Sequence, residues 1–301
     1  MSTNKLATLA VTIGTAFVGA VRAGAAATLH VPGDFATIQA CIDAAVSDVD
    51  ECVVAPGTYH ETINFLGKAI TVRSSGGRDV TTIDATGLNG SVVTCASGEG
   101  PDTVLDGFTI TGGTGTDVGG STYGGGMHND HSSPTIADCI FIRNSAWYGA
   151  GGGMYNNGGS PTVTNCTFSL NGATTGNGGG MYNYYSSATV VNCVFSGNMT
   201  TSAGGGMLND HSAAAVANCT FTGNNAYAGG GISNIGGSPT VTNCRFNTNV
   251  AADGNGGGMF NFDSSPTVID CAFVENKATF GGGMYNHTAF STGIHSSSFT
   301  K

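Results

Sequence analysis

A short glycine-rich motif returns every 25 to 27 residues through the second half of the chain. It reads Gly-Gly-Gly followed by Met or Ile, and its last residue is Met127, Met154, Met181, Met207, Ile232, Met259 and Met284. A cysteine series shifts in step with it, at Cys139, Cys166, Cys193, Cys219, Cys244 and Cys271. A fixed period of this length is typical of repeat architectures, in which each unit buries its core against its neighbours. The sequence therefore predicts a solenoid.

One repeat reads as three short strands joined by turns. Cys166 and Phe168 are two residues apart, so both can point inward, because side chains alternate along a strand. Val163 lies three residues before Cys166, which requires a bend, and Asn165 tolerates the left-handed backbone of such a bend. Stacked repeats would place Met on Met, Val on Val, Cys on Cys and Phe on Phe. We predict an all-β fold, a right-handed parallel β-helix with three sheets and a short N-terminal capping helix.

Asparagines occupy three more positions of the repeat. We interpret their amides as ladders that bond to one another and to turn backbone, with ligand binding as the alternative. The columns are Asn129, Asn156, Asn183, Asn209, Asn234, Asn261 and Asn286; Asn165, Asn192, Asn218 and Asn243, with Asp138 and Asp270 at the ends; and Asn144, Asn171, Asn198, Asn224, Asn249 and Asn276.

Composition excludes several other classes. Fifty glycines in 301 residues without a triplet repeat exclude collagen, and 40% hydrophobic with only 9% charged residues excludes a disordered chain. So much glycine also disfavours helical repeats. The net charge of -10 makes nucleic acid and anionic membranes poor partners.

Residues 1–25 read as a signal peptide. Lys5 precedes an uncharged stretch over 6–21, and a small-residue cleavage pattern follows at Ala23-Gly24-Ala25. The stretch is short for a membrane span, which needs about 20 residues, and an uncleaved anchor is the alternative. We therefore expect a secreted, cell-surface or outer-membrane protein.

The mature chain divides into three regions. Residues 26–60 are expected to form a cap and the first strands, with a helix over 34–46 that begins at Asp34 or Thr37. Residues 61–123 would form irregular coils, and residues 124–301 the regular repeats. No cap follows the last repeat, so we expect either a fragment or an edge covered by another chain.

The nine cysteines divide into two kinds. Cys41 and Cys52 flank the expected cap helix, and we predict a disulfide between them in an exported protein. The six stacked cysteines are interpreted as small buried hydrophobes, with a metal or redox column as the alternative. Cys95 has no evident partner.

Two parts of the chain resemble known families. The Gly-Gly-Gly-Met motifs paired with Phe-x-x-Asn resemble the repeats of chlamydial-type polymorphic outer membrane proteins. Residues 35–75 resemble the start of pectin-lyase-like right-handed β-helix proteins, a group with esterase-like and lyase members. The first resemblance implies adhesion and the second a polysaccharide as substrate or ligand, although this fold hosts unrelated functions.

Residues for catalysis are not brought together by the repeat. A polyuronate lyase needs a basic residue, but Arg143 and Arg245 lie four repeats apart without an evident Asp cluster. A glycosidase needs two neighbouring carboxylates. Asp253, Asp263 and Glu275 fall in adjoining repeats but on different sides, and we interpret them as solvated.

Two Asp-His pairs share one register, Asp130-His131 and Asp210-His211. We assign no Ser or Cys nucleophile to them and interpret them as turn residues. We predict no catalytic residue, no metal and no small-molecule cofactor.

The position after Met holds several aromatic residues, and alternation places it on the outward face. Such a stripe suits sugar rings or a protein partner, whereas simple stacking along the sheet is the alternative. The predicted binding residues are Tyr155, Tyr182, Tyr184, Tyr185, Phe260, Phe262 and Tyr285. A second outward column consists of Thr135, Thr162, Thr189, Thr240 and Thr267, which raises ice binding as a further hypothesis.

The main hypothesis is a non-catalytic β-helix for adhesion or for recognition of an extracellular glycan or surface protein. The alternative is a polysaccharide-active lyase or hydrolase.

Overall fold

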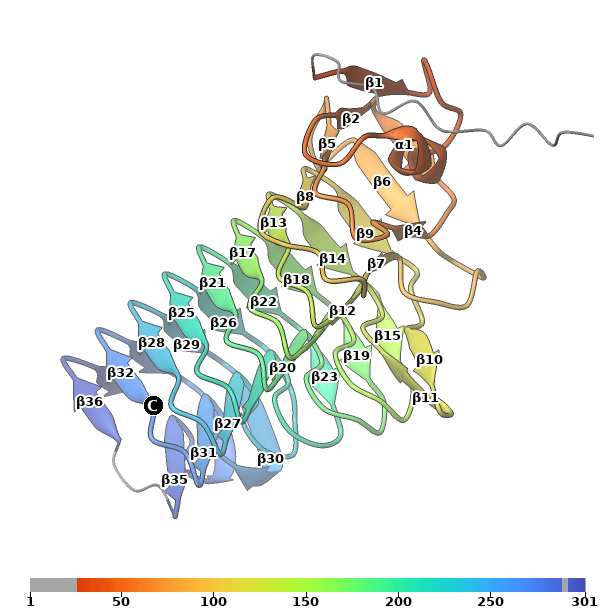
Figure 1. Ribbon diagram of the computed structural model, residues 1–301. Helices are drawn as coiled ribbons and strands as arrows, with labels where there is room; N and C mark the ends of the chain where they lie inside the picture. The colour runs from red at the N-terminus through yellow and green to blue at the C-terminus, as the bar shows by residue number, and fades with distance from the viewer. Residues whose placement is uncertain (1–25, 289–291, 301) are drawn as a thin grey trace, which may run out of the picture.

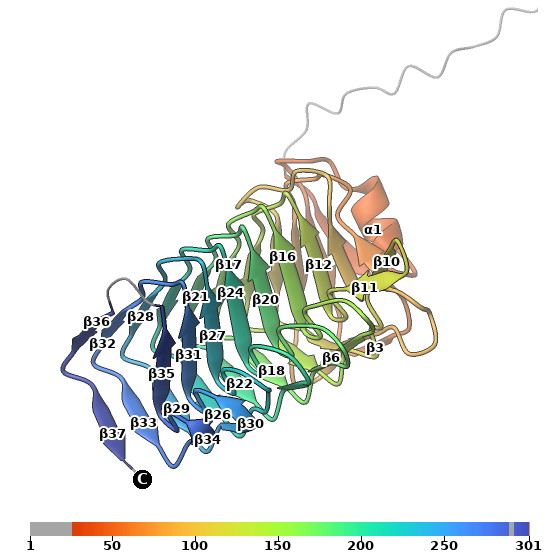
Figure 2. The ribbon, with the colours of Figure 1, turned by 90° about the horizontal axis from the view of Figure 1, so that it is seen from below.

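The computed structural model describes residues 26–288 and 292–300; the predicted signal peptide lies outside these ranges. The chain winds into a parallel β-helix with three main sheets, as predicted (Figure 1). Each regular coil contributes one strand to each sheet, and the coils stack along one axis (Figure 2). In the described ranges, no helix is long and apolar enough to cross a membrane.

The strands of the three sheets follow the stacking order of the coils. The first sheet contains β1 Thr28–Val31, β2 Glu51–Val54, β5 Thr71–Ser74, β8 Val104–Asp106, β13 Thr135–Ala137, β17 Thr162–Thr164, β21 Thr189–Val191, β25 Ala215–Ala217, β28 Thr240–Thr242, β32 Thr267–Ile269 and β36 Gly293–His295. The second contains β4 Ile63–Asn64, β7 Val93–Cys95, β12 Met127–Asp130, β16 Met154–Asn157, β20 Met181–Tyr184, β24 Met207–Asp210, β27 Ile232–Ile235, β31 Met259–Phe262 and β35 Met284–His287. The third contains β3 Gly57–Tyr59, β6 Thr81–Asp84, β9 Thr109–Thr111, β14 Ile140–Ile142, β18 Thr167–Ser169, β22 Val194–Ser196, β26 Thr220–Thr222, β29 Arg245–Asn247, β33 Ala272–Val274 and β37 Ser298–Thr300.

Additional strands lie in the Gly-rich segments that close the coils. They are β15 Ser145–Ala146, β19 Gly172–Ala173, β23 Met199–Thr200, β30 Val250–Asn255 and β34 Lys277–Phe280. In the segment 112–124, an antiparallel hairpin of β10 Thr116–Val118 and β11 Ser121–Tyr123 precedes the regular coils.

Like side chains stack inside the solenoid, as the repeat predicted. Met154 pairs with Met181, Val163 with Val190 and Phe168 with Phe195 in adjacent coils. Successive buried Phe rings are parallel, with centroids 4.5–5.0 Å apart. The stacked cysteines are buried free thiols.

The asparagine columns have two different roles. In the Phe-x-x-Asn column, Oδ1 of Asn198 accepts bonds from the backbone N–H and the Nδ2 of Asn171, at 3.0 and 3.1 Å, and its own Nδ2 donates to the Phe168 carbonyl at 2.9 Å. The column that contains Asn129 forms a similar buried ladder. The column of Asn165 supplies the predicted bend, where Asn165 has φ 55° and Asn192 has φ 56°.

The helix of the N-terminal cap is shorter than predicted, and the cap contains one more strand than predicted. Helix α1, Ile38–Ala44, begins after Thr37, whose side chain accepts from the Ala40 N–H. Glu61 accepts from the first two backbone N–H groups of the helix, and the predicted disulfide joins Cys41 to Cys52. Strand β1, which the sequence did not predict, pairs with β2 and covers the first coil edge.

Candidate functional site

The Gly-rich segments fold back over the outward face of the second sheet. In one coil, Ala150 belongs to the same small cluster as Tyr155, outside the main core. The next residue, Gly151, has φ 69° and turns the chain toward the strand that carries Tyr155. This cluster contains Ala150, Tyr155, Tyr182, Ala203 and Leu208, with Tyr123 and Tyr184 packed against it. The position after Met is therefore buried in these coils rather than open to solvent.

The predicted aromatic stripe is consequently only partly exposed. The expectation of an outward, exposed face is wrong for Tyr155 and Tyr182, which are each 8% exposed. Tyr184, Phe260 and Tyr285 are half-buried, whereas Tyr185 and Phe262 are exposed. Neighbouring rings do pack along the sheet, as the alternative interpretation of the stripe predicted: Phe260 stacks on Tyr285 at 5.9 Å, and Tyr155 lies 5.5 Å from Tyr182 with the rings tilted by 51°.

A cavity of about 400 Å³ opens where the loops meet this sheet. Its walls include the tyrosines Tyr123, Tyr148, Tyr155, Tyr182 and Tyr184, together with the amide of Asn177. Tyr148 is 67% exposed at the loop, while Tyr155 and Tyr182 form the buried side. Such walls combine aromatic faces with hydroxyl and amide groups, which is the chemistry that contacts sugars.

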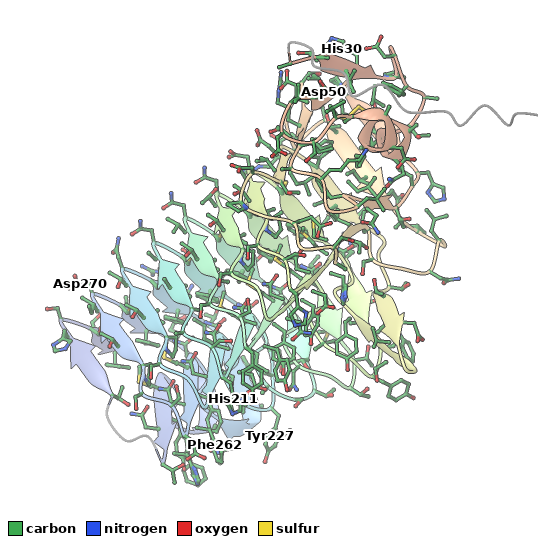
Figure 3. All side chains as sticks on the ribbon, in the orientation of Figure 1. His30, Asp50, His211, Tyr227, Phe262 and Asp270 are labelled. Atoms are coloured by element: carbon green, nitrogen blue, oxygen red, sulfur yellow. A yellow bond between two sulfur atoms is a disulfide. The ribbon has the colours of Figure 1, made fainter. Side chains whose placement is uncertain are left out.

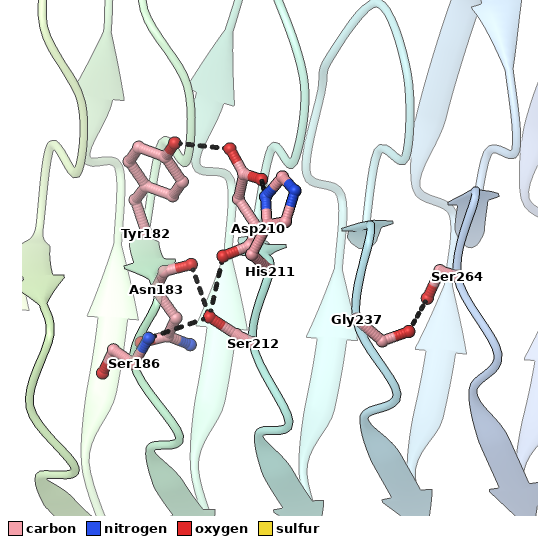
Figure 4. Close-up of polar contacts among 8 residues, drawn as sticks. All are labelled: Tyr182, Asn183, Ser186, Asp210, His211, Ser212, Gly237 and Ser264. Carbon is pink, nitrogen blue, oxygen red and sulfur yellow. Dashed lines mark hydrogen bonds and ion pairs between the residues drawn. The ribbon is translucent and has the colours of Figure 1, made fainter.

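A hydrogen-bonded chain begins at one wall of this cavity (Figure 4). The Tyr182 hydroxyl donates to Oδ2 of Asp210 at 2.8 Å, and Oδ1 of Asp210 lies 2.6 Å from Nδ1 of His211. Burial raises the pKa of the Tyr182 phenol, and the Asp210 carboxylate raises it further, so the phenol stays protonated. The His211 ring stacks on Tyr185 at 4.9 Å.

The two Asp-His pairs lie in turns, as predicted. His131 and His211 have φ 49° and 50°, at the same position of two coils, and each Nδ1 faces the carboxylate of the preceding Asp. The nearby Ser212 hydroxyl donates to the carbonyls of Asn183 and Asp210, so it serves the backbone (Figure 4).

The other residues considered for catalysis remain separate. Arg143 and Arg245 are exposed, and Asp263 accepts a hydrogen bond from Thr288. Within residues 26–288 and 292–300, no group of three or more His, Cys, Asp or Glu side chains is arranged as metal ligands would be. The Thr column lies on the first sheet and is interrupted by Ala215; ice binding stays an untested prediction.

A second cavity, of about 470 Å³, lies along the outer side of the Gly-rich loops. Its lining includes Met199 and Tyr227, which are 61% and 57% exposed. Tyr148 and Tyr227 are not among the residues predicted from the repeat, because they fall in its variable stretch. The sequence does contain one signal for them, because each is an aromatic residue in a loop made mostly of small residues.

Comparison with solved structures gives an alginate lyase from Paenibacillus sp. str. FPU-7, which aligns with a TM-score of 0.52 and 12% identity over 87% of this chain and 98% of the enzyme. The chain has the pectin-lyase-like fold. A pectin methylesterase from carrot aligns with a TM-score of 0.47 and 12% identity, over 90% of this chain and 88% of that one. No protein family matches the sequence, and neither does any curated protein. The pectin-lyase-like fold confirms one of the two resemblances; the likeness to polymorphic outer membrane repeats stays a prediction.

Proposed function

We propose that the protein is exported and recognises an extracellular polysaccharide without altering it. The observation that carries the proposal is the cavity walled by Tyr123, Tyr148, Tyr155, Tyr182 and Tyr184. Aromatic rings offer flat faces to the C–H side of a sugar, while their hydroxyls and Asn177 bond to its polar edge. The pattern of residues 1–25 and the Cys41–Cys52 disulfide support export.

Binding to a panel of immobilised polysaccharides tests the proposal. Tyr148→Ala removes a 67% exposed ring from the cavity, so binding should fall about tenfold while the fold persists. Phe280→Ala is the matched control, because Phe280 is 62% exposed in a later Gly-rich loop and lines neither cavity. Unchanged binding by Tyr148→Ala, or no binding to any glycan, would contradict the proposal.

A polysaccharide-active enzyme is the second candidate, and one observation favours it. The chain from Tyr182 through Asp210 to His211 links a phenol of the cavity to an acid and an imidazole, the groups used in proton transfer. The Paenibacillus protein of the same fold is a lyase for a polysaccharide. New reducing ends or unsaturated products from any glycan that is bound, lost in Asp210→Asn with binding retained, would establish this activity in place of simple recognition.

A further inference from the structure

The two cavities adjoin along one side of the solenoid. Thr175 lines the tyrosine cavity, and its neighbour Thr174 lines the second cavity. The second cavity then continues over the loops of three further coils, past Met199 and Tyr227 to Asp253. Figure 3 places Tyr227 on the same side of the solenoid as His211, and away from Asp270.

Exposed aromatic rings stand at separate points of this path. Tyr148 and Tyr227 occupy the Gly-rich loops of coils three steps apart. At the spacing of adjacent strands, this places them about 14 Å apart along the axis. Between them the lining includes the hydroxyls of Thr174 and Thr201 and the exposed side chain of Met199. A surface of this kind can contact several successive sugars of a chain laid parallel to the axis.

The charge of the walls restricts what can lie there. Among the residues that the structure describes, no Arg, Lys or His lines either cavity, and Asp253 is the one carboxylate in the two linings. Lys277 lines a different cavity, with Glu275 beside it. The whole chain carries a net charge of -10, which repels polyanions. A polyuronate or sulfated chain would therefore lie near the Asp253 carboxylate with no basic side chain to pair with its own negative charges.

We infer that the ligand is an uncharged polysaccharide, which spans both cavities and stacks sugar rings on Tyr148 and Tyr227. This inference rests on the proposed function and adds the ligand class and a second subsite. It separates this chain from its structural neighbours, whose names give alginate and pectin, because the walls here lack the cations that carboxylated sugars require.

The test measures binding of short and long uncharged oligosaccharides, such as those from glucans, xylans and mannans, against polygalacturonate and alginate. Salt is varied from low ionic strength to about 0.5 M, which screens surface charge. Uncharged chains should bind with affinity that salt leaves unchanged. Tyr227→Ala should weaken long oligosaccharides about tenfold and leave short ones that fill only the tyrosine cavity unaffected. Phe280→Ala is the control.

Each outcome of this experiment tests a different part of the inference. Preferential binding of polygalacturonate or alginate would overturn the ligand class while leaving glycan recognition in place. Equal affinity of Tyr227→Ala for long chains would overturn the second subsite. Failure of the proposed function would look different, since Tyr148→Ala would then change nothing or no polysaccharide would bind at all.

Discussion

The hydroxyl of Tyr182 lies 2.8 Å from Oδ2 of Asp210 in the next coil, although Tyr182 is only 8% exposed. The bond ties the outward face of one coil to the turn of the next, next to the cavity proposed as the glycan site. Asp210 also faces His211, so its carboxylate has two side-chain partners, the Tyr182 hydroxyl and the His211 imidazole.

Removal of the hydroxyl in Tyr182→Phe should lower the free energy of unfolding by about 2 kcal/mol. The physical reason is that a hydrogen bond to a charged group is lost while the carboxylate stays partly buried. Urea unfolding measures the change. Tyr185→Phe is the control, since Tyr185 is 56% exposed, and it should stay within about 0.5 kcal/mol. Equal effects from the two substitutions would show that the Asp210 bond contributes nothing.

The buried asparagine ladder should be far more sensitive than the exposed one. Asn198→Ala leaves the backbone N–H of Asn171 without its acceptor in the core and removes a hydrogen bond to the Phe168 carbonyl, so we expect a loss of about 3 kcal/mol or more. Asn192→Gly is the matched control in the same coil, where Asn192 is exposed and has φ 56°, a backbone that glycine adopts freely. Its free energy of unfolding should change by less than about 1 kcal/mol. A similar cost at both positions would contradict the structural role assigned to the ladder.

The interior was predictable because strand alternation and turn preference are local properties of the sequence. Cys166 and Phe168 had to share a face by strand alternation, and Asn165 had to take the left-handed bend, which it does with φ 55°. Periodicity then fixed which side chains stack on which. The same local logic missed β1, since a strand at the edge is selected by the coil that it covers.

The candidate site was less predictable because it depends on contacts outside the repeat. Strand alternation correctly places Tyr155 away from the solenoid core. It does not show that Ala150 packs in the same cluster as Tyr155, next to the turn at Gly151. Tyr148 and Tyr227 stand in segments whose length and composition vary from coil to coil. Neither tyrosine occupies a position that is repeated from coil to coil, so the sequence pattern does not place them beside the cavities, and only the stacked structure does.

The last glycine of the repeated motif should be irreplaceable for a steric reason. A Cβ on Gly153 would lie 2.4 Å from the Gly180 carbonyl oxygen and 2.9 Å from Cδ1 of Phe168. Gly153→Ala should therefore cost about 3 kcal/mol or more, or prevent folding, because backbone and a packed ring would have to move. Gly90→Ala is the control, since a Cβ there has no atom within 4 Å. Circular dichroism with urea titration compares the two, and a tolerant Gly153 would contradict the close packing of adjacent coils.

The buried Cys95 thiol should make the fold sensitive to alkali. Burial raises the pKa of the Cys95 thiol well above its usual range, so the folded chain keeps a proton that the unfolded chain loses at about pH 8.5. The stabilising contribution of Cys95 is therefore complete below that pH and is lost as the pH rises, at up to about 1.4 kcal/mol per pH unit. Urea unfolding between about pH 7 and pH 10, with the disulfide intact, should show this decline.

Cys95→Ala should make that decline shallower above about pH 8.5, although it also lowers stability at neutral pH by leaving a small cavity. Val93→Ala is the matched control, because Val93 is buried in the same strand, β7, and carries no titratable group. Its stability should fall by a similar amount at every pH, so that its curve runs parallel to that of the unsubstituted chain. A Cys95→Ala curve that also runs parallel would mean that the thiol is ionised as readily in the fold as out of it, which contradicts its burial.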